Sequence, residues 1–261
     1  FCLNMAALPP RLTPSPKLPA LQVRSATKPS VKKLHAPSFP VVLTPAQRSS
    51  ATARLNTPKR FMIFPIPPPI LWARGDISLL NKPSIGMVGA RNASSLGGRT
   101  ARMLAAELSE QGHVIVSGLA RGIDTSAQIA SLEHGTIAVL AGGVDVIYPS
   151  ENAHLARDIS LKGLLISEQP MGLAPQARHF PRRNRLISGL SIGLVVVEAA
   201  AKSGSLITAR NALDQGRDVL AVPGHPFDAR ASGCNMLIRD GATLVRSAAD
   251  ALETLAPLAP D

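Results

Sequence analysis

The sequence reads Ile85-Gly86-Met87-Val88-Gly89-Ala90-Arg91-Asn92-Ala93-Ser94-Ser95 where a short apolar run meets a glycine, an arginine and small polar residues. A helical pattern follows at residues 96–111. We interpret this order as a buried strand, a tight turn and a helix N-terminus, the place where α/β sheets usually hold phosphates and other anions. No third glycine completes a dinucleotide fingerprint. Glycine-rich turns are common, so this turn alone leaves a second interpretation open. In that interpretation Gly89 only makes a turn from strand to helix and Arg91 is a solvated loop residue.

The rest of the chain alternates between strand-like apolar runs and helical patterns. The apolar runs fall at 85–89, 114–117, 136–141, 164–167, 192–197, 219–222 and 243–245. The helical patterns fall at 96–111, 123–133, 152–162, 182–190, 205–215, 233–239 and 247–255. This alternation predicts right-handed β-α-β crossovers and an α/β fold with a mostly parallel sheet. We expect Asp124 to be the N-cap of its helix, and Gly112 and Gly216 to end theirs.

The positive charge of the chain is confined to its N-terminal part. The net charge is +11, and residues 1–75 hold 11 Lys and Arg with no Asp or Glu, whereas residues 76–261 hold 17 of each sign. Residues 1–60 are also rich in Pro and Ser, which predicts a basic tail or an incomplete N-terminal domain before a domain at 61–261. An organellar transit peptide is the alternative for this segment. Residues 61–71 are apolar but too rich in proline for a helix, so we expect an extended strap.

Composition also restricts the location and class of the protein. The two cysteines, Cys2 and Cys234, give neither a disulfide framework nor metal-ligand spacing. No apolar run approaches the about 18 residues of a membrane span. We therefore predict a cytoplasmic protein that does not enter a membrane.

Glycine-containing turns follow five of the predicted strands. They read Gly89-Ala90-Arg91, Ser117-Gly118-Leu119-Ala120-Arg121-Gly122, Ala141-Gly142-Gly143, Lys202-Ser203-Gly204-Ser205 and Pro223-Gly224-His225. In a parallel sheet these turns share one edge, where ligands bind, and backbone N–H groups of such turns can face an anion. Five turns at one edge predict an anion-binding surface.

Basic residues accompany these turns. Arg178, Arg182, Arg183 and Arg185 lie close together around Phe180, which offers a surface for stacking a base. The alternative is a solvated helix start with Phe180 in the core. Lys202 precedes a predicted helix, and a lysine beside a helix N-terminus suits phosphate.

The sequence shows no convincing catalytic set. It lacks a P-loop and a Gly-x-Ser-x-Gly elbow, and its His residues do not pair with Cys or carboxylates at metal spacing. Asp124 is better explained as a helix cap, and Glu198 as a partner of an arginine at the strand ends. We therefore predict a binding protein without catalysis, cofactor or metal.

Several motifs, in order, resemble those of the DprA (Smf) family of bacterial DNA-processing proteins. They are Val88-Gly89-Ala90-Arg91, Ser117-Gly118-Leu119-Ala120-Arg121-Gly122-Ile123-Asp124, Phe180-Pro181-Arg182-Arg183-Asn184-Arg185, Ser203-Gly204-Ser205-Leu206-Ile207-Thr208-Ala209, Ala221-Val222-Pro223-Gly224 and Gly233-Cys234-Asn235-Met236-Leu237-Ile238. Two departures stand out: Ala90 replaces a frequent Ser or Thr, and Glu151 stands where some members carry a lysine.

The resemblance implies an extended Rossmann-like, three-layer fold that binds single-stranded DNA and no nucleotide cofactor. It also implies protection of single strands during natural transformation, help in loading a RecA-type recombinase, and a homodimer through the Rossmann domain. The alternatives are a nucleotide hydrolase similar to phosphoribohydrolases, and a scaffold whose basic tail alone binds nucleic acid. From the turns and the resemblance together, the predicted nucleic-acid-binding residues are Gly89, Arg91, Ser94, Gly118, Arg121, Gly122, Arg178, Phe180, Arg182, Arg183, Arg185, Lys202, Ser203, Gly204 and Ser205.

Overall fold

The computed structural model describes residues 39–41, 68 and 70–256. All the described helices and strands belong to one compact unit, Ala36–Asp261. The expected strap at 61–71 lies mostly outside the described residues.

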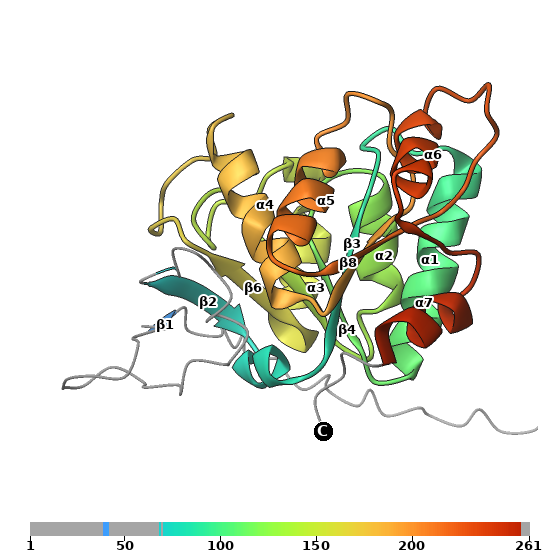
Figure 1. The fold of residues 1–261 in the computed structure, drawn as a ribbon. Coiled ribbons are helices and arrows are strands. Elements are labelled where there is room, and N and C mark those ends of the chain that lie inside the picture. Colours follow the sequence, from blue (N-terminus) through green and yellow to red (C-terminus); the bar gives the residue numbers. More distant parts are fainter. Residues whose placement is uncertain (1–38, 42–67, 69, 257–261) are drawn as a thin grey trace, which may run out of the picture. The chain divides into compact units, whose positions relative to one another are not determined.

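A single nine-stranded sheet forms the centre of this unit (Figure 1). Its strand order is β1-β2-β6-β5-β4-β3-β7-β8-β9. The seven neighbouring strands β6-β5-β4-β3-β7-β8-β9 run parallel to one another. At the β6 edge of the sheet, β2 pairs with β6 and β1 pairs with β2, both in antiparallel fashion. The predicted α/β class with a mostly parallel sheet is confirmed. The strands are β1 (Phe39–Val41), β2 (Leu71–Gly75), β3 (Ser84–Val88), β4 (Val114–Ser117), β5 (Thr136–Val139), β6 (Leu164–Ser167), β7 (Gly193–Val196), β8 (Asp218–Ala221) and β9 (Thr243–Leu244).

Helices cover both faces of the sheet, which gives the three-layer arrangement. The α-helices are α1 (Ser95–Glu110), α2 (Ile123–Ala130), α3 (Ala153–Lys162), α4 (His179–Leu190), α5 (Ser205–Asp214), α6 (Ser232–Arg239) and α7 (Ala248–Leu255). The described residues also form two short 3₁₀ helices, η2 (Ile77–Asn81) and η3 (Ser150–Asn152). None of the helices in the described part of the chain is long and apolar enough to cross a membrane.

The core follows the alternation of side chains along the strands. In β3, Ile85 and Met87 pack with α1, α2 and α7, whereas Val88 packs with α4 and α5 on the other face. A third cluster joins β5 and β6 to α3. Every residue of β3 is buried, because a parallel sheet covered by helices on both faces excludes water from both sides.

The strand order creates a switch point between β3 and β7. The chain adds β4, β5 and β6 on one side of β3 and then returns to place β7 on its other side. The connections after β3 and β7 therefore lead away from each other. A crevice at such a point, beyond the carboxyl ends of the strands, is the usual ligand site of an open α/β sheet.

Three local expectations differ from the structure. The sequence patterns did not reveal β1 or β2, since both are short and β1 lies within the predicted tail. Helix α4 begins at His179, three residues before the predicted start at residue 182. Pro181 is tolerated in its first turn, because backbone N–H groups there have no acceptor within the helix and the missing N–H of proline costs nothing. Asp124 is not an N-cap: Gly122 holds that position, and the Asp124 carboxylate instead accepts hydrogen bonds from Gly118 N (3.0 Å) and Ala120 N (3.3 Å).

Candidate functional site

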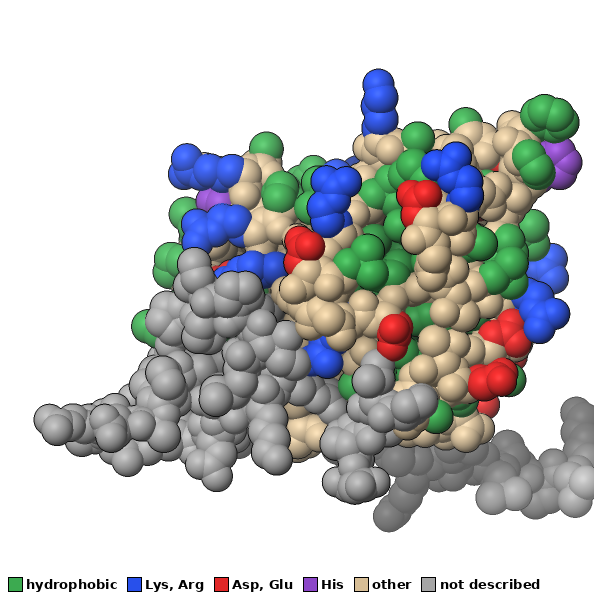
Figure 2. Space-filling view, in the orientation of Figure 1, with side chains coloured by type: hydrophobic (Ala, Val, Ile, Leu, Met, Phe, Trp, Pro, Cys, Tyr) green, Lys and Arg blue, Asp and Glu red, His purple; other side chains and the backbone are tan. Residues whose placement is uncertain are grey.

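Two adjoining hollows lie at the carboxyl edge of the sheet. The larger, of about 600 Å³, is lined by the turns after β3, β4 and β7, by α4 and by Arg230. The smaller, of about 320 Å³, adds Arg121, Tyr148 and Pro149. Both hollows are lined by Arg91, Asn92, Ala120, Phe180 and Arg183, so we treat them as one strand-end groove. Figure 2 shows Lys and Arg side chains along this upper edge of the molecule.

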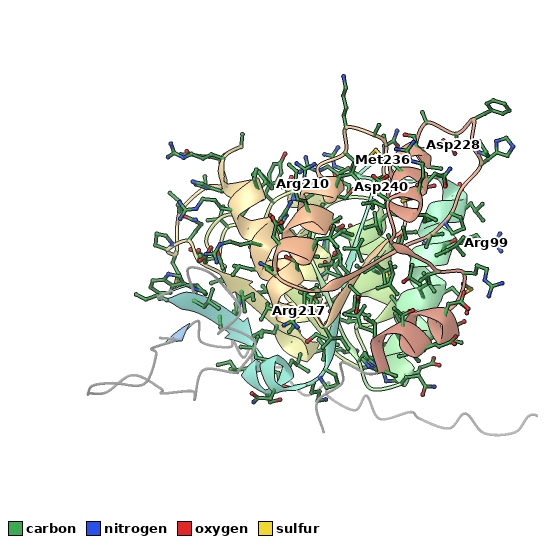
Figure 3. All side chains as sticks on the ribbon, in the orientation of Figure 1. Arg99, Arg210, Arg217, Asp228, Met236 and Asp240 are labelled. Carbon is green, nitrogen blue, oxygen red and sulfur yellow. The ribbon has the colours of Figure 1, made fainter. Side chains whose placement is uncertain are left out.

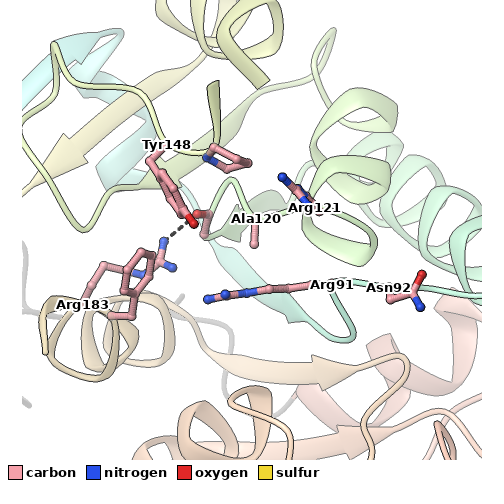
Figure 4. Close-up of a pocket in the computed structure, with 9 residues that line it drawn as sticks. Arg91, Asn92, Ala120, Arg121, Tyr148 and Arg183 are labelled. Carbon is pink, nitrogen blue, oxygen red and sulfur yellow. Dashed lines mark hydrogen bonds between the residues drawn. The ribbon is translucent and has the colours of Figure 1, made fainter. Parts of the chain in front are cut away.

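Phe180 is the centre of an aromatic and cationic cluster in the groove. The guanidinium carbon of Arg91 lies 5.4 Å from the centroid of the Phe180 ring, and that of Arg183 lies 6.0 Å from it. The Tyr148 ring meets Phe180 edge-on, with 5.8 Å between centroids. Figure 4 shows Arg91, Arg121, Tyr148 and Arg183 surrounding the smaller hollow. The cluster thus presents a half-exposed ring between cations, as a base-stacking site requires.

Arg183 is buried and forms the floor of this cluster. Its Nη1 donates to the carbonyl oxygen of Gly118 (2.6 Å) and to that of Val139. Burial lowers the pKa of Arg183 to about 10, while the charge of Asp124 acts in the opposite direction. Burial raises the pKa of Asp124, and the charge of Arg183 together with the two backbone N–H donors opposes that rise. Arg183 therefore stays protonated at neutral pH and faces an acidic group inside the protein.

Arg91 and Lys202 are exposed cations of the groove. Within the described part of the chain neither forms an ion pair. Arg121 is exposed too, but its Nε lies 2.5 Å from a carboxylate oxygen of Glu151. Glu151 thus neutralises a cation of the site.

The N-terminus of α1 is occupied by an acidic side chain of the protein itself. Glu198 accepts hydrogen bonds from the backbone N (2.9 Å) and the hydroxyl of Ser94, the N-cap residue of α1. We expected Glu198 to be the partner of an arginine at the strand ends; its hydrogen-bond partner is Ser94. The hydrogen bond and charge of Asp228, followed by the charge of Glu198, raise the pKa of the groove residue Arg230. A carboxylate at a helix N-terminus fills the position that a cofactor pyrophosphate takes in dinucleotide-binding proteins.

The N-terminus of α5, in contrast, opens into the groove. Residues 202–205 line the larger hollow, and the hydroxyls of Ser203 and Ser205 lie 2.7 Å apart. Apart from Gly204 itself and its chain neighbours, no heavy atom of the described residues lies within 4 Å of the place that a Cβ on Gly204 would take. An anion can approach the first turn of this helix beside Lys202.

Glycines of the neighbouring turns serve the packing of the protein itself. A Cβ on Gly118 would lie 2.5 Å from Nη1 of Arg183. A Cβ on Gly122 would lie 2.3 Å from the carbonyl oxygen of Ala90, and Gly122 has a φ of +74°. These two glycines let the turns after β3 and β4 and helix α4 close around the groove.

The predicted site residues separate into those that line the groove and those that do not. Arg178 and Arg182 are exposed at the start of α4, outside the groove lining, and Arg185 pairs with Glu168. Burial raises the pKa of Glu168, against the charges of Arg185 and Arg182. Ser94 and Gly122 also lie outside the lining. The predicted residues that line it are Gly89, Arg91, Gly118, Arg121, Phe180, Arg183, Lys202, Ser203, Gly204 and Ser205.

Several lining residues were absent from the predicted set, among them the polar or aromatic residues Asn92, Tyr148 and Arg230. The sequence could have predicted Asn92 and Tyr148 as lining residues, since each follows a glycine turn at a strand end. Nothing in the sequence predicted Arg230, because it lies nine residues beyond β8 and reaches the groove only through the path of its loop. No cluster of His, Cys, Asp and Glu suited to a metal ion occurs among the residues that the structure describes.

Comparison with known proteins gives consistent matches. A family model described as DNA recombination-mediator protein A matches residues 52–256. The DNA processing protein DprA of Bacillus subtilis is 50% identical over 192 residues, which cover 72% of this chain and 65% of that protein. Protein Smf of Escherichia coli is 44% identical over 191 residues, covering 72% and 51%. The chain thus spans about half to two thirds of the length of these curated relatives.

Solved structures match as well. The X-ray structure of DprA from Streptococcus pneumoniae has a TM-score of 0.73 and 42% identity, covering 75% of this chain and 70% of that one. DprA from Helicobacter pylori, whose structure is described as giving insight into its single-stranded DNA binding mode, has a TM-score of 0.74 and 32% identity, covering 79% and 96%. With its motifs, fold and relatives in agreement, this chain belongs to the DNA recombination-mediator protein A family, whose members are named DprA or Smf.

Proposed function

We propose that this chain binds single-stranded DNA in the strand-end groove. The observation that carries the proposal is the half-exposed Phe180 ring beside Arg91, with Lys202 and the open α5 N-terminus along the same groove. An unpaired base stacks on such a ring, while cations and backbone N–H groups hold the phosphates. Paired bases of a duplex do not expose a face for this stacking. The relative from Helicobacter pylori, described as a single-stranded DNA binder, supports the same choice.

In this proposal the groove acts by binding and not by catalysis. Carboxylates at its edge are already engaged by protein groups: Asp124 by backbone N–H groups of the turn after β4, Glu198 by Ser94, and Glu151 by Arg121. A nucleotide hydrolase of the phosphoribohydrolase type needs a carboxylate that reaches its substrate.

The cellular role we propose is that of a recombination mediator in DNA uptake. The protein would protect incoming single strands in natural transformation and help load a RecA-type recombinase. The name of the matching family model supports the mediator role. We further propose a homodimer through the Rossmann-like domain, which sedimentation of the purified protein tests directly.

Arg91→Ala tests the groove. We expect about tenfold weaker binding of single strands, since one charge-assisted phosphate contact is lost. The slope of log affinity against log salt should flatten by about 0.7, the contribution of one phosphate. The loss should be equal across base sequences, because a phosphate contact reads no base. Titration of labelled oligonucleotides at two salt concentrations measures all three quantities.

Arg99→Ala is the matched control. Arg99 is an exposed arginine on α1, outside the groove lining (Figure 3), so its removal changes the net charge equally. We expect this variant to bind as the parent protein does. If Arg91→Ala and Arg99→Ala behave alike, the role assigned to Arg91 is wrong.

A further inference from the structure

The loop between β8 and α6 carries an unusual aromatic residue. Phe227 is 93% exposed, whereas Leu96, the next most exposed large apolar residue among those described, is 71% exposed. Burial therefore contributes almost nothing to the position of Phe227. This loop lies beyond the carboxyl end of β8, on the same edge as the strand-end groove; Figure 3 places Asp228 on it.

The loop is nevertheless firmly built. The side-chain amide of Asn235 bonds to both the N–H (3.1 Å) and the carbonyl oxygen (3.0 Å) of Gly224. A backbone hydrogen bond from Asp228 N to the His225 carbonyl (2.9 Å) closes a turn around Phe227. Asp228 in turn accepts from the backbone N of Arg230 (2.9 Å) and pairs with its guanidinium. A loop held this way presents its apex side chain without a large ordering cost on binding.

Two rings stand together at the apex. The centroids of His225 and Phe227 lie 5.5 Å apart with their planes tilted by 47°. Both side chains are exposed. Their faces form an aromatic surface of the kind on which bases of a single strand stack, irrespective of sequence.

The loop is also continuous with the groove. Arg230, at its returning end, lines the larger hollow. The hydroxyl of Ser232 accepts a hydrogen bond from the backbone N of Ala201 (3.0 Å), which ties the loop to the turn that carries Lys202. Cations therefore lie between the Phe180 cluster and the loop apex, and a phosphate backbone can follow them from one aromatic surface to the other.

We propose that Phe227, supported by His225, is a second base-stacking site, which holds a nucleobase of the strand after it leaves the strand-end groove. This inference rests on the proposed function. A half-exposed ring, cations and an exposed ring follow one another along one edge. This order favours a nucleic-acid strand over a protein partner, because an apolar protein contact has no use for the intervening cations.

The test uses three substitutions at one exposed position. Phe227→Ala and Phe227→Leu should each weaken binding of an oligothymidylate of about 16 nucleotides by about tenfold, and leave one of about 4 nucleotides unaffected. Phe227→Trp should bind the longer strand at least as tightly as the parent. The fluorescence of the new tryptophan should be quenched by the longer strand only, because the shorter strand does not reach the loop. The parent protein contains a single tryptophan, Trp72 in β2, and its fluorescence serves as the background.

The outcomes separate this inference from the proposed function. If the parent protein binds no single strand, both fall. If Arg91→Ala weakens binding but Phe227→Ala does not, only the second stacking site is overturned. If Phe227→Leu restores the binding that Phe227→Ala loses, apolar contact and not stacking is responsible. If Phe227→Ala leaves DNA binding intact and impairs only recombinase loading, the loop is a protein contact and the inference is wrong.

Discussion

At the scale of single residues, the arginines of the site have different tasks. Arg183 is buried and bonded to two carbonyl oxygens, so it holds the turn after β4 and the end of β5 in place. Arg91 is exposed and lies over the Phe180 ring, where it can reach a ligand. Arg121 is exposed but paired with Glu151. All three arginines are associated with the glycine turns in the sequence, so the sequence does not distinguish their roles. The burial of each side chain and the groups that it contacts do distinguish them.

Glu151→Gln should strengthen binding of single strands. The substitution removes a negative charge beside the groove and leaves Arg121 free to contact phosphate. We expect about three- to tenfold higher affinity at low salt, and a gain that shrinks as salt increases, because the site is exposed to solvent. Fluorescence anisotropy with one oligonucleotide over a salt series measures the effect.

Glu133→Gln is the control for this prediction, since Glu133 forms a comparable exposed pair with Lys162 outside the groove. The gain from Glu151→Gln should also vanish in a protein that carries Arg121→Ala. An equal gain in both glutamate variants would point to net charge alone and contradict a local role for Glu151.

At the scale of elements, the site depends on how closely two turns approach. The turn after β3 and the turn after β4 meet at Gly122, where Ile123 N donates to the Ala90 carbonyl (3.2 Å). Gly122 has φ of +74° and ψ of −118°, a conformation open almost only to glycine. The distance between the two turns, and with it the position of Arg91 relative to Arg121, is set at this junction.

Gly122→Ala should therefore destabilise the protein strongly. Backbone strain and the contact with the Ala90 carbonyl together should lower the free energy of unfolding by about 3 kcal/mol. Gly216→Ala is the matched control, because Gly216 has a similar φ of +67° but no neighbour within 4 Å of the added Cβ. Its cost should be about 1 to 2 kcal/mol. Urea unfolding of both variants gives the comparison, and equal costs would refute the role of the close approach.

At the scale of the whole molecule, the charge and the candidate site lie in different parts of the chain. The net charge of +11 belongs to residues 1–75, whereas residues 76–261 carry equal numbers of both signs. β1 (Phe39–Val41) pairs with β2 although it falls within the predicted tail, so a deletion that spares the sheet must end before Phe39. The rest of that predicted tail lies outside the described residues.

Removing residues 1–35 should separate general from local attraction to DNA. The deletion takes away six Lys and Arg and no acidic residue, so the net charge falls from +11 to +5 (11 − 6). Binding of duplex DNA and its salt dependence should decrease, because non-specific attraction follows net charge. Single-strand binding should persist, and Arg91→Ala should still weaken it about tenfold. Loss of all single-strand binding on deletion would assign the activity to the basic segment.

Much of the fold was predictable because a parallel sheet marks its strands clearly. Buried strands such as Ile85–Val88 read as unbroken apolar runs, and glycines mark the turns that follow them. β2 was missed because its alternating burial and its arginine dilute the signal in a short strand. Of the site, the glycine turns, Arg91 and Arg183 were predictable, since glycine and arginine stand out at strand ends. The other arginines predicted around Phe180 lie outside the groove lining, because the lining depends on how α4 packs; they are Arg178, Arg182 and Arg185.

The amino-acid sequence alone was sufficient to predict the order of strands and helices from β3 onward, the turns at one edge and the family. Hydrophobic periodicity and turn residues are local properties, and they are written along the chain. Which charged groups remain available to a ligand became clear only from the folded structure. Whether an arginine faces water, a carbonyl or a carboxylate depends on residues far away in sequence: Arg183 meets Val139, Arg121 meets Glu151, and Glu198 fills the α1 N-terminus at Ser94. Folding thus leaves Arg91 and Lys202 as the exposed cations that line the groove without an ion pair in the described part of the chain.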